Sequence, residues 1–485
     1  MSRRDRNLAP FSEDAGVRRG TDPAQYAFHL GFAAIILAFL LPSTWLVHLG
    51  LYSDAPGGNV LTKFHPTTYM AVLAAWAALS SRTSGGGINR LFRERPALSW
   101  AAILILFCML YSFVNVGVSG VALYVETYLD AAMVAIALDR ATERQCRILG
   151  YTILILTLVN VAIAVAEGRM ETHLLPEPDV QMTKAEAAFL QKAEEFRGQA
   201  WFSHPLTGSL VTAMALFLTL GMRLRKWLVA PILVILLVGL MSFGGRGAFA
   251  VSVMMIAAAA LFQLASGLVT RRLNIGFLSA FIAGALLLPA LFIVITTHSD
   301  IGMRLTSHLY MDDSADVRVI QWQVLDQLRL RDVLFGMPYD RIEALKANIG
   351  LAAVGSDIEN PWLLMFLNLG IVAYPFLVAA IFLLLLHLAR QANNSVSWLL
   401  ITAILLIVST SNSLGRRTPD LIFLSAFAVA MRTVRSEEDQ PIEAPAAARQ
   451  PAAHGLLGLV PQPRQRSLTE RPISQRASPS VEPRG

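Results

Sequence analysis

Long apolar runs separated by short polar segments dominate this 485-residue chain. About 20 consecutive apolar residues cross a bilayer as an α-helix, whereas the strands of a membrane β-barrel alternate apolar and polar residues over short segments. The runs here show no such alternation, so the pattern predicts an all-α polytopic membrane protein with about twelve transmembrane helices. The predicted spans are Ala27–Leu49, Pro66–Ser80, Leu98–Val118, Val121–Leu138, Ile148–Ala166, Leu206–Met222, Trp227–Phe243, Gly247–Leu268, Ile275–Thr296, Pro361–Leu388, Trp398–Ser411 and Pro419–Met431.

Lysine and arginine in the short loops predict the orientation of these spans, because basic loops stay on the cytoplasmic side. The basic N-terminal arm, residues 1–24, is therefore predicted to begin in the cytoplasm. Alternation of twelve spans returns the C-terminal tail, residues 433–485, to the same side. Residues 25–432 between them form the predicted transmembrane domain.

Two long loops are expected on the outer side, at about residues 167–205 and 298–360, the second between the ninth and tenth spans. Thr183–Phe196 in the first loop predicts a short helix, because Thr183 can cap it. Asp316–Arg331 in the second loop carries apolar residues on one face and predicts an amphipathic helix. A long loop with its own helix is typical of a functional segment.

Composition supports this class and excludes several others. Charged residues make up 15% of the chain and hydrophobic residues 55%, against a charged share of about 25% in soluble domains. The net charge of +6 resides mostly in loops and tails, which favours contact with anionic membrane lipid and not with nucleic acid. The tail has too little apolar material to fold and is predicted to be disordered. Cys108 and Cys146 fall at different depths, so we expect no disulfide.

An arginine between glycines marks the hinge between two predicted spans, at Ser242–Phe249. A cation at the centre of a bilayer costs roughly 2.5–3.5 kcal/mol on insertion scales and less near the interface. The predicted topology places Arg246 on the outer side, against the general trend for basic residues. The polar residues expected on that side are Arg197, His204, Arg246, Arg304, His308, Arg318, Asp357, Glu359, Asn360, Arg416 and Arg417.

These residue types suit the binding of a phosphorylated lipid. Guanidinium groups bind phosphate through two parallel hydrogen bonds and stay charged in a partly dry site. A carboxylate or an imidazole can take the proton from an attacking hydroxyl group. The chain shows no phosphate-binding loop, zinc-ligand set or nucleophile elbow, so no metal and no cofactor are predicted.

Each candidate also has a structural alternative. Arg246 could extend towards lipid headgroups, and Arg416 and Arg417 could anchor the chain at the interface. Glu359 and Asn360 precede Pro361 and could mark only the start of a helix. Two further alternatives are a turn role for His204 and a solvent-exposed helix position for Arg318.

The order of these segments resembles the O-antigen ligase and O-antigen polymerase superfamily of bacterial envelope polysaccharide synthesis. The resemblance covers about residues 150–390. Its four segments are Arg197–Pro205, Ser242–Ala248 with a serine–arginine–glycine turn, Arg318 with Trp322 and Leu334–Gly336, and Glu359–Leu363 followed by Leu369–Ile371.

The resemblance implies a glycosyltransferase C-like fold in the bacterial inner membrane. It also implies a metal-independent, inverting glycosyl transfer at the periplasmic face, with an undecaprenyl-pyrophosphate-linked oligosaccharide as donor. A flippase and a chain-length regulator are the partners expected of such an enzyme. Arg246 and Arg318 would bind the pyrophosphate, assisted by Arg197 or Arg416. The further candidates from these segments are His204, Asn360 and Trp322.

One position departs from the family pattern. Many members, ligases especially, carry a histidine beside the asparagine where the large loop returns to the membrane, and this chain has Glu359. The general base is therefore open between Glu359, Asp357 and His308. The missing histidine favours a repeat-unit polymerase over a ligase. A transporter of polysaccharide or lipid-linked sugar is the third hypothesis, based on Glu126 and Asp130 within the fourth predicted span.

Overall fold

A computed structural model describes residues 23–52, 60–80, 87–174, 196–202, 204–222, 224–270, 319–351, 358–392, 395–410 and 412–434. These residues belong to one compact unit that ends at Ser436. Four predictions lie wholly or mostly outside them: the N-terminal arm, the helix at Thr183–Phe196, the span at Ile275–Thr296 and the tail.

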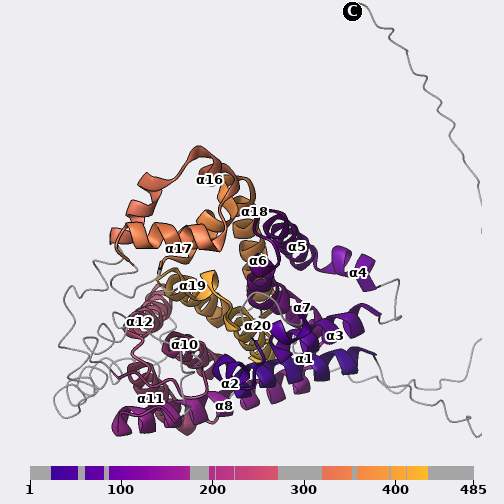
Figure 1. Ribbon diagram of the computed structural model, residues 1–485. Coiled ribbons are helices and arrows are strands. Elements are labelled where there is room, and N and C mark those ends of the chain that lie inside the picture. Colours follow the sequence, from indigo (N-terminus) through magenta and orange to yellow (C-terminus); the bar gives the residue numbers. More distant parts are fainter. Residues whose placement is uncertain are drawn as a thin grey trace, which may run out of the picture. The chain divides into compact units, whose positions relative to one another are not determined.

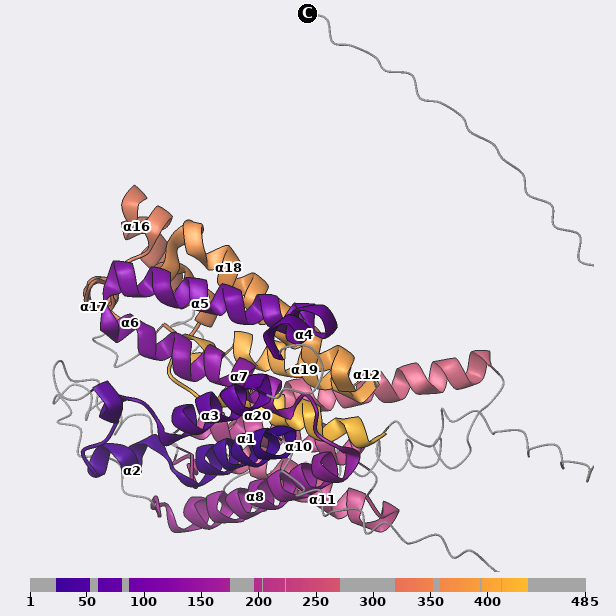
Figure 2. The ribbon, with the colours of Figure 1, turned by 90° about the vertical axis from the view of Figure 1, so that its right-hand side faces the viewer.

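Every regular element among the described residues is a helix (Figure 1). The transmembrane-type helices lie alongside one another, with α2 at one end of this array and α4 towards the other (Figure 2). The α-helices are α1 Pro23–Leu40, α2 Ser43–His48, α3 Pro66–Ser80, α4 Gly87–Glu94, α5 Pro96–Val116, α6 Val118–Leu123, α7 Asp130–Leu138, α8 Glu143–Met170, α10 Pro205–Gly221, α11 Lys226–Ser242, α12 Arg246–Val269, α16 Leu330–Phe335, α17 Tyr339–Asn348, α18 Pro361–Ala392, α19 Ser395–Ser409 and α20 Asp420–Ala430.

Six helical stretches in the described part of the chain are long and apolar enough to cross a membrane. They are α1, α5, the stretch Gly120–Leu138, α8, α12 and α18. The protein is therefore an all-α, multi-pass membrane protein by the length and hydropathy of its helices. Helices α10, α11, α19 and α20 are apolar but shorter, so the expected number of twelve spans stays a prediction.

The first predicted span, Ala27–Leu49, is wrong at its C-terminal end. Helix α1 ends at Leu40, and α2 begins after Pro42, whose backbone is extended. Proline has no backbone N–H group and cannot continue the hydrogen bonding of a preceding helix. The apolar run thus continues past a break that its hydropathy does not reveal.

The amphipathic helix predicted at Asp316–Arg331 is confirmed only in part over the residues that the structure describes, where Val319 and Ile320 are α-helical. A short 3₁₀-helix, η3, covers Gln321–Gln327, and Leu328 is extended before α16 begins. Val324 is fully buried, as the apolar pattern requires. Residues of α17 and of the start of α18 complete the core in which Val324 lies.

Two hydrophobic cores organise the residues that the structure describes. The larger core joins the transmembrane-type helices. The smaller core lies between residues 319–351 and the first turns of α18, and Figure 1 shows α16 and α17 beside that end of α18.

Two glycines join the smaller core to the kink in α18. Gly370 has a φ of 63° inside the helix, and Gly336 has a φ of 77°. A Cβ atom on Gly370 would lie 2.4 Å from the backbone nitrogen of Gly336, so side chains at this contact are excluded. The backbone N–H of Met337 donates to the carbonyl of Leu367 at 2.9 Å. The large loop is therefore fixed directly onto α18 just ahead of the kink.

Candidate functional site

The Arg246 hinge is a tight turn between α11 and α12. Gly244 has a φ of 69°, and the N–H of Gly245 donates to the carbonyl of Leu240 at 3.0 Å. A Cβ atom on Gly245 would lie 2.2 Å from the hydroxyl oxygen of Ser209, so glycine lets this turn approach α10. Arg246 is the first residue of α12 and is half-buried. The N-terminal position favours anions, because the first N–H groups of a helix carry partial positive charge.

Buried polar groups of α8 hold the segment that carries Arg197. The carboxylate of Glu167 is fully buried and accepts hydrogen bonds from the backbone N–H groups of Gln199, at 2.7 Å, and Ala200, at 2.8 Å. The side-chain oxygen of Asn160 accepts from the N–H of Trp201 at 3.0 Å. These bonds fix the backbone of residues 199–201 against α8.

The same segment reaches the Arg246 hinge. The N–H of Gly198 donates to the carbonyl of Ser242 at 3.0 Å. The Arg197 side chain crosses Gly244, and its Cδ atom would lie 2.9 Å from a Cβ atom placed there. Glycine at 244 therefore provides both the positive φ of the turn and the space for this arginine. Arg197 therefore meets the hinge at Gly244, two positions before Arg246 in the chain.

His204 caps α10 beside two positive charges. Its Nδ1 atom accepts a hydrogen bond from the N–H of Leu206 at 3.2 Å. Desolvation by the surrounding protein, and after it the positive charges of Arg416 and Arg197, lower the pKa of His204 to about 4. The ring is neutral at physiological pH and works as the helix cap, as one of the two sequence hypotheses for it holds.

Arg417 has a different role from that of its neighbour Arg416. It forms a two-pronged ion pair with Glu126, at 2.9 Å from Nε and 3.0 Å from Nη2. Nη2 also donates to the carbonyl of Lys63, and the guanidinium lies 4.3 Å from the centre of the Tyr52 ring. The Tyr52 hydroxyl donates to Glu126 at 2.8 Å. We call Tyr52, Glu126, Arg417 and the backbone of Lys63 the Arg417 clamp.

A π-helical segment, η2 Tyr124–Leu129, supplies the acid of this clamp. The hydroxyl of Thr127 donates to the carbonyl of Arg416 at 2.8 Å and accepts from the N–H of Thr418 at 3.2 Å. The hydroxyl of Tyr128 donates to the carbonyl of Leu414. Single π-helical turns are rare and frequent at functional sites. Here the wider turn lets three consecutive residues hold residues 414–418, which include Arg416.

Glu359 and Asn360 lie where the large loop meets α18. The Asn360 side-chain oxygen accepts from the N–H groups of Trp362, at 3.0 Å, and Leu363, at 3.2 Å, and so caps the helix. The side-chain oxygen of Gln321 accepts from the N–H groups of Glu359 and Asn360. Asn360 therefore has a structural role, and Gln321 joins the loop to this turn.

The structure brings four sequence candidates to one end of the helices: Arg197, His204, Arg246 and Arg416. A Cβ atom on Gly247 would lie 3.6 Å from the hydroxyl of Thr410, which places the start of α12 beside the end of α19. The indole N–H of Trp362 donates to Ser409 at 2.9 Å and brings the first turn of α18 to the same place. We call this end of the array the hinge end.

The remaining candidates are placed less closely. Trp322 is half exposed on η3, next to the buried Gln321. Asp357, His308 and Arg318 lie outside the described residues. Within the described residues no group of three His, Cys, Asp or Glu side chains could hold a metal ion.

Sequence reasoning did not identify Glu167, Asn160 and Thr127 as residues that position the candidates. The signal was available for Glu167 and Asn160, because polar side chains near or within an apolar span are expected to have partners. A scan against protein-family models finds no match for this chain, and a search of curated proteins finds no similar sequence.

Proposed function

We propose that this protein polymerises undecaprenyl-pyrophosphate-linked oligosaccharide repeats at the periplasmic face of a bacterial inner membrane. The observation that carries the proposal is that Arg416 and Arg197 lie close enough to His204 to lower its pKa, and that Arg197 crosses Gly244 in the hinge that begins α12 at Arg246. Like charges repel each other, and their assembly at a helix N-terminus suits a multiply charged anion. A pyrophosphate on a lipid would enter at this depth with its chain in the bilayer.

The proposed reaction is an inverting glycosyl transfer. A hydroxyl group of the acceptor sugar attacks the anomeric carbon of the donor, and the bond from that carbon to the pyrophosphate oxygen breaks. The proton of the hydroxyl passes to a base, and undecaprenyl pyrophosphate leaves with the bonding electrons. Arg246 would stabilise the charge that develops on this leaving group, with Arg197 and Arg416 beside it. Arg318 is proposed for the same role on the resemblance alone.

Glu359 is the proposed general base among the described residues. Gln321 fixes its backbone N–H, and the capped start of α18 fixes the residue that follows. A carboxylate on the first turn before a helix is well placed to orient an acceptor hydroxyl and receive its proton. Asp357 and His308 are the alternative bases, and substitution of each to Asn decides between them.

The decisive experiment uses the purified full-length protein in liposomes with synthetic undecaprenyl-pyrophosphate-linked repeats. We expect polymer from the wild-type protein and about 10²–10³-fold slower polymer formation from Arg246→Ala, the usual effect of removing one group that stabilises developing charge. Arg246→Lys should also be slow, because a single ammonium group cannot replace a guanidinium fork. Both variants should insert and unfold as the wild type does.

Three outcomes would contradict the proposal in distinct ways. A single transfer to a different acceptor would identify a ligase. Movement of the repeat across the bilayer without a new glycosidic bond would identify a transporter. Normal polymer from Arg246→Ala would remove the hinge from the site.

A further inference from the structure

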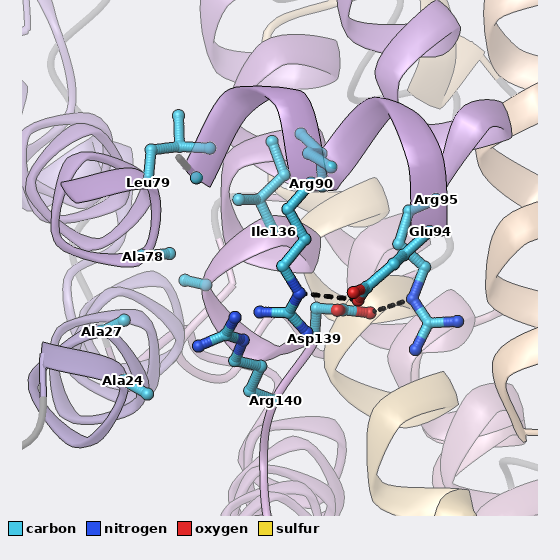
Figure 3. A pocket seen from close by; sticks show the side chains of 13 residues that line it. Ala24, Ala27, Ala78, Leu79, Arg90, Glu94, Arg95, Ile136, Asp139 and Arg140 are labelled. Atoms are coloured by element: carbon cyan, nitrogen blue, oxygen red, sulfur yellow. Dashed lines mark hydrogen bonds and ion pairs between the residues drawn. The ribbon is translucent and has the colours of Figure 1, made fainter. Parts of the chain in front are cut away.

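The two ends of α5 differ in what surrounds them. Near its first turn, arginines are paired within the protein, with 2.7 Å between the Nε atom and a carboxylate oxygen in each pair (Figure 3). The pairs are Arg90 with Glu94 and Arg95 with Asp139. Near its last turns, apolar side chains of α5 and of the neighbouring elements are exposed instead. The exposed surface at this second end requires a partner of its own.

Helix α16 of the large loop packs against the last turns of α5. The hydroxyl of Tyr111 donates to the carbonyl of Phe335 at 3.0 Å, and the side-chain amide of Asn115 donates to the same carbonyl at 3.4 Å. Tyr111 and Asn115 are four residues apart and therefore lie on one face of α5. Figures 1 and 2 both show α16 at the periphery of the helix array. The C-terminal end of α16 thus lies at the depth at which α5 ends.

The kink in α18 marks the same depth. Gly370 interrupts the helical backbone, and the part of α18 beyond it, residues 371–392, is about 33 Å long at 1.5 Å per residue. That length matches the hydrocarbon core of a bilayer, which is about 30 Å thick. A Cβ atom on Gly370 would lie 2.5 Å from the carbonyl oxygen of Leu334. Helix α16 therefore ends where the membrane-crossing part of α18 begins.

Exposed apolar side chains continue from both of these helices onto α16. Both α5 and α18 are long and apolar enough to cross a membrane, so their exposed apolar residues face lipid. Near the contact with α16, Val114 of α5 is 76% exposed and Ile371 of α18 is 53% exposed. On α16 itself, Phe335 is 47% exposed and Leu330 is 74% exposed. The lipid-facing surface of the two spans is thus extended by a helix of the large loop.

The charges of α16 suit lipid headgroups. Arg329 and Arg331 are the chain neighbours of Leu330, and both are exposed. The acid of this helix, Asp332, is buried and pairs with Arg341. The exposed part of α16 therefore carries positive charge beside apolar side chains. This combination is typical of helices in the membrane surface, where long basic side chains extend to the phosphates.

We propose that α16 lies in the surface of the bilayer, with Leu330 and Phe335 among the acyl chains and Arg329 and Arg331 at phospholipid phosphates. Lipid is the occupant of this surface because the surface is continuous with the lipid-facing sides of α5 and α18. The next residue but one after Phe335, Met337, belongs to the smaller core. Lipid contact at α16 therefore holds that core close to the membrane. The proposal does not depend on the proposed polymerisation.

The test is spin labelling of the full-length protein in nanodiscs that hold one copy in phosphatidylglycerol. A nitroxide is attached at Leu330→Cys or at Phe335→Cys. Its collisions with oxygen, which concentrates in lipid, are compared with its collisions with a water-soluble nickel chelate. Cys108 and Cys146 are buried, so the introduced thiol is the accessible one. We expect collisions with oxygen to exceed those with nickel at both positions.

Two reference positions calibrate this result. Leu110 on α5 is 60% exposed and faces lipid, so Leu110→Cys should give the same order of collisions. Asn348 is exposed at the end of α17 that is remote from α16, so Asn348→Cys should give the reverse order.

A second experiment tests the arginines. Arg329→Gln and Arg331→Gln should each shift the label at Leu330→Cys about fivefold towards water, which corresponds to about 1 kcal/mol per arginine at an anionic membrane surface. An unchanged label in both variants would show that the arginines do not bind headgroups.

Two results would overturn the placement of α16. Nickel collisions that dominate at both 330 and 335, as expected at 348, would show that the surface faces water. Rare collisions with both reagents would show that protein covers it. If one cysteine variant fails to insert, the other still decides between these outcomes.

Discussion

The Arg417 clamp and the arginines around His204 meet in the chain at Arg416 and Arg417, and they differ in how far their charges are exposed to solvent. In the clamp, Arg417 meets a carboxylate, a backbone carbonyl and an aromatic ring. Around His204, desolvation and after it the positive charges of Arg416 and Arg197 lower the pKa of the ring. The boundary between the two regions falls between Arg416 and Arg417.

This difference indicates a structural role for the clamp and a ligand-binding role for the arginines around His204. The pair of Arg417 and Glu126 is largely shielded from solvent and fixes the backbone around it. Charges of one sign at an exposed helix start favour a ligand of the opposite sign. Thr127 links the two regions, because its hydroxyl is bonded to the backbone of both Arg416 and Thr418.

The largest expected effect comes from breaking the clamp. Arg417→Ala leaves the carboxylate of Glu126 buried without its cation, and such losses cost about 3–5 kcal/mol of unfolding free energy. Equilibrium unfolding in mixed micelles measures this loss. The double variant Glu126→Gln, Arg417→Ala should recover part of it, because no uncompensated charge then remains.

Arg416→Ala is the matched control for that experiment. Its side chain is exposed, so we expect the unfolding free energy to change by less than about 0.5 kcal/mol. Polymer formation in liposomes should nevertheless slow. Equal destabilisation by the two alanine variants would remove the distinction between clamp and arginine cluster.

A smaller effect is expected at Asn360, which sequence reasoning placed among the site candidates. Loss of its side-chain oxygen removes the N-cap of α18, so Asn360→Ala should cost about 1 kcal/mol of unfolding free energy. Asn360→Ser keeps an acceptor and should restore most of that stability. Thermal unfolding at fixed lipid composition measures both variants.

Glu359→Gln provides the comparison at the neighbouring position. Here we expect unchanged stability and slower polymer formation, because the amide keeps the shape of the side chain but not its basicity. If Asn360→Ser restores stability without restoring polymer formation, Asn360 also contacts substrate. It then has both a structural and a substrate-binding role.

The class of fold could be predicted from sequence because apolar length is a local property. The runs that became α3, α5, α8 and α12 were located to within a few residues, apart from the longer ends of α8. The positions at which these helices end or change type were harder to predict. Pro42 separates α1 from α2 within an apolar run, and the helix predicted at Asp316–Arg331 tightens into η3, whose core is completed by α17 and the start of α18.

The sequence identified the residues of the candidate site, but it did not predict what each of them does. The spacing of glycines identified Arg246, but only packing shows that Gly244 makes space for Arg197. Arg416 and Arg417 look alike in sequence, and the partner that separates them, Glu126, lies 291 residues away from Arg417 in the chain. Long-range pairing of this kind leaves no local pattern.

The smallest effect concerns the pH dependence of stability at His204. Its pKa of about 4 in the folded protein is below the ordinary value of 6.5, so the unfolded chain takes up a proton first as the pH falls. His204 therefore contributes a loss of stability between pH 6.5 and pH 4 and nothing above that window. His204→Asn keeps an acceptor for the helix cap and should make unfolding less sensitive to acid in this range.

The same histidine reports on the arginines directly. Inorganic pyrophosphate bound between Arg416 and Arg197 would offset their positive charge and raise the pKa of His204 towards 6.5. Titration of a ¹³C-labelled His204 ring by NMR, with and without pyrophosphate, measures that shift. Arg417→Lys, which keeps the charge of the clamp, should leave the shift unchanged, whereas Arg416→Gln should reduce it. An unaltered pKa with pyrophosphate present would mean that the gathered arginines do not bind this anion and that their positive field serves another ligand.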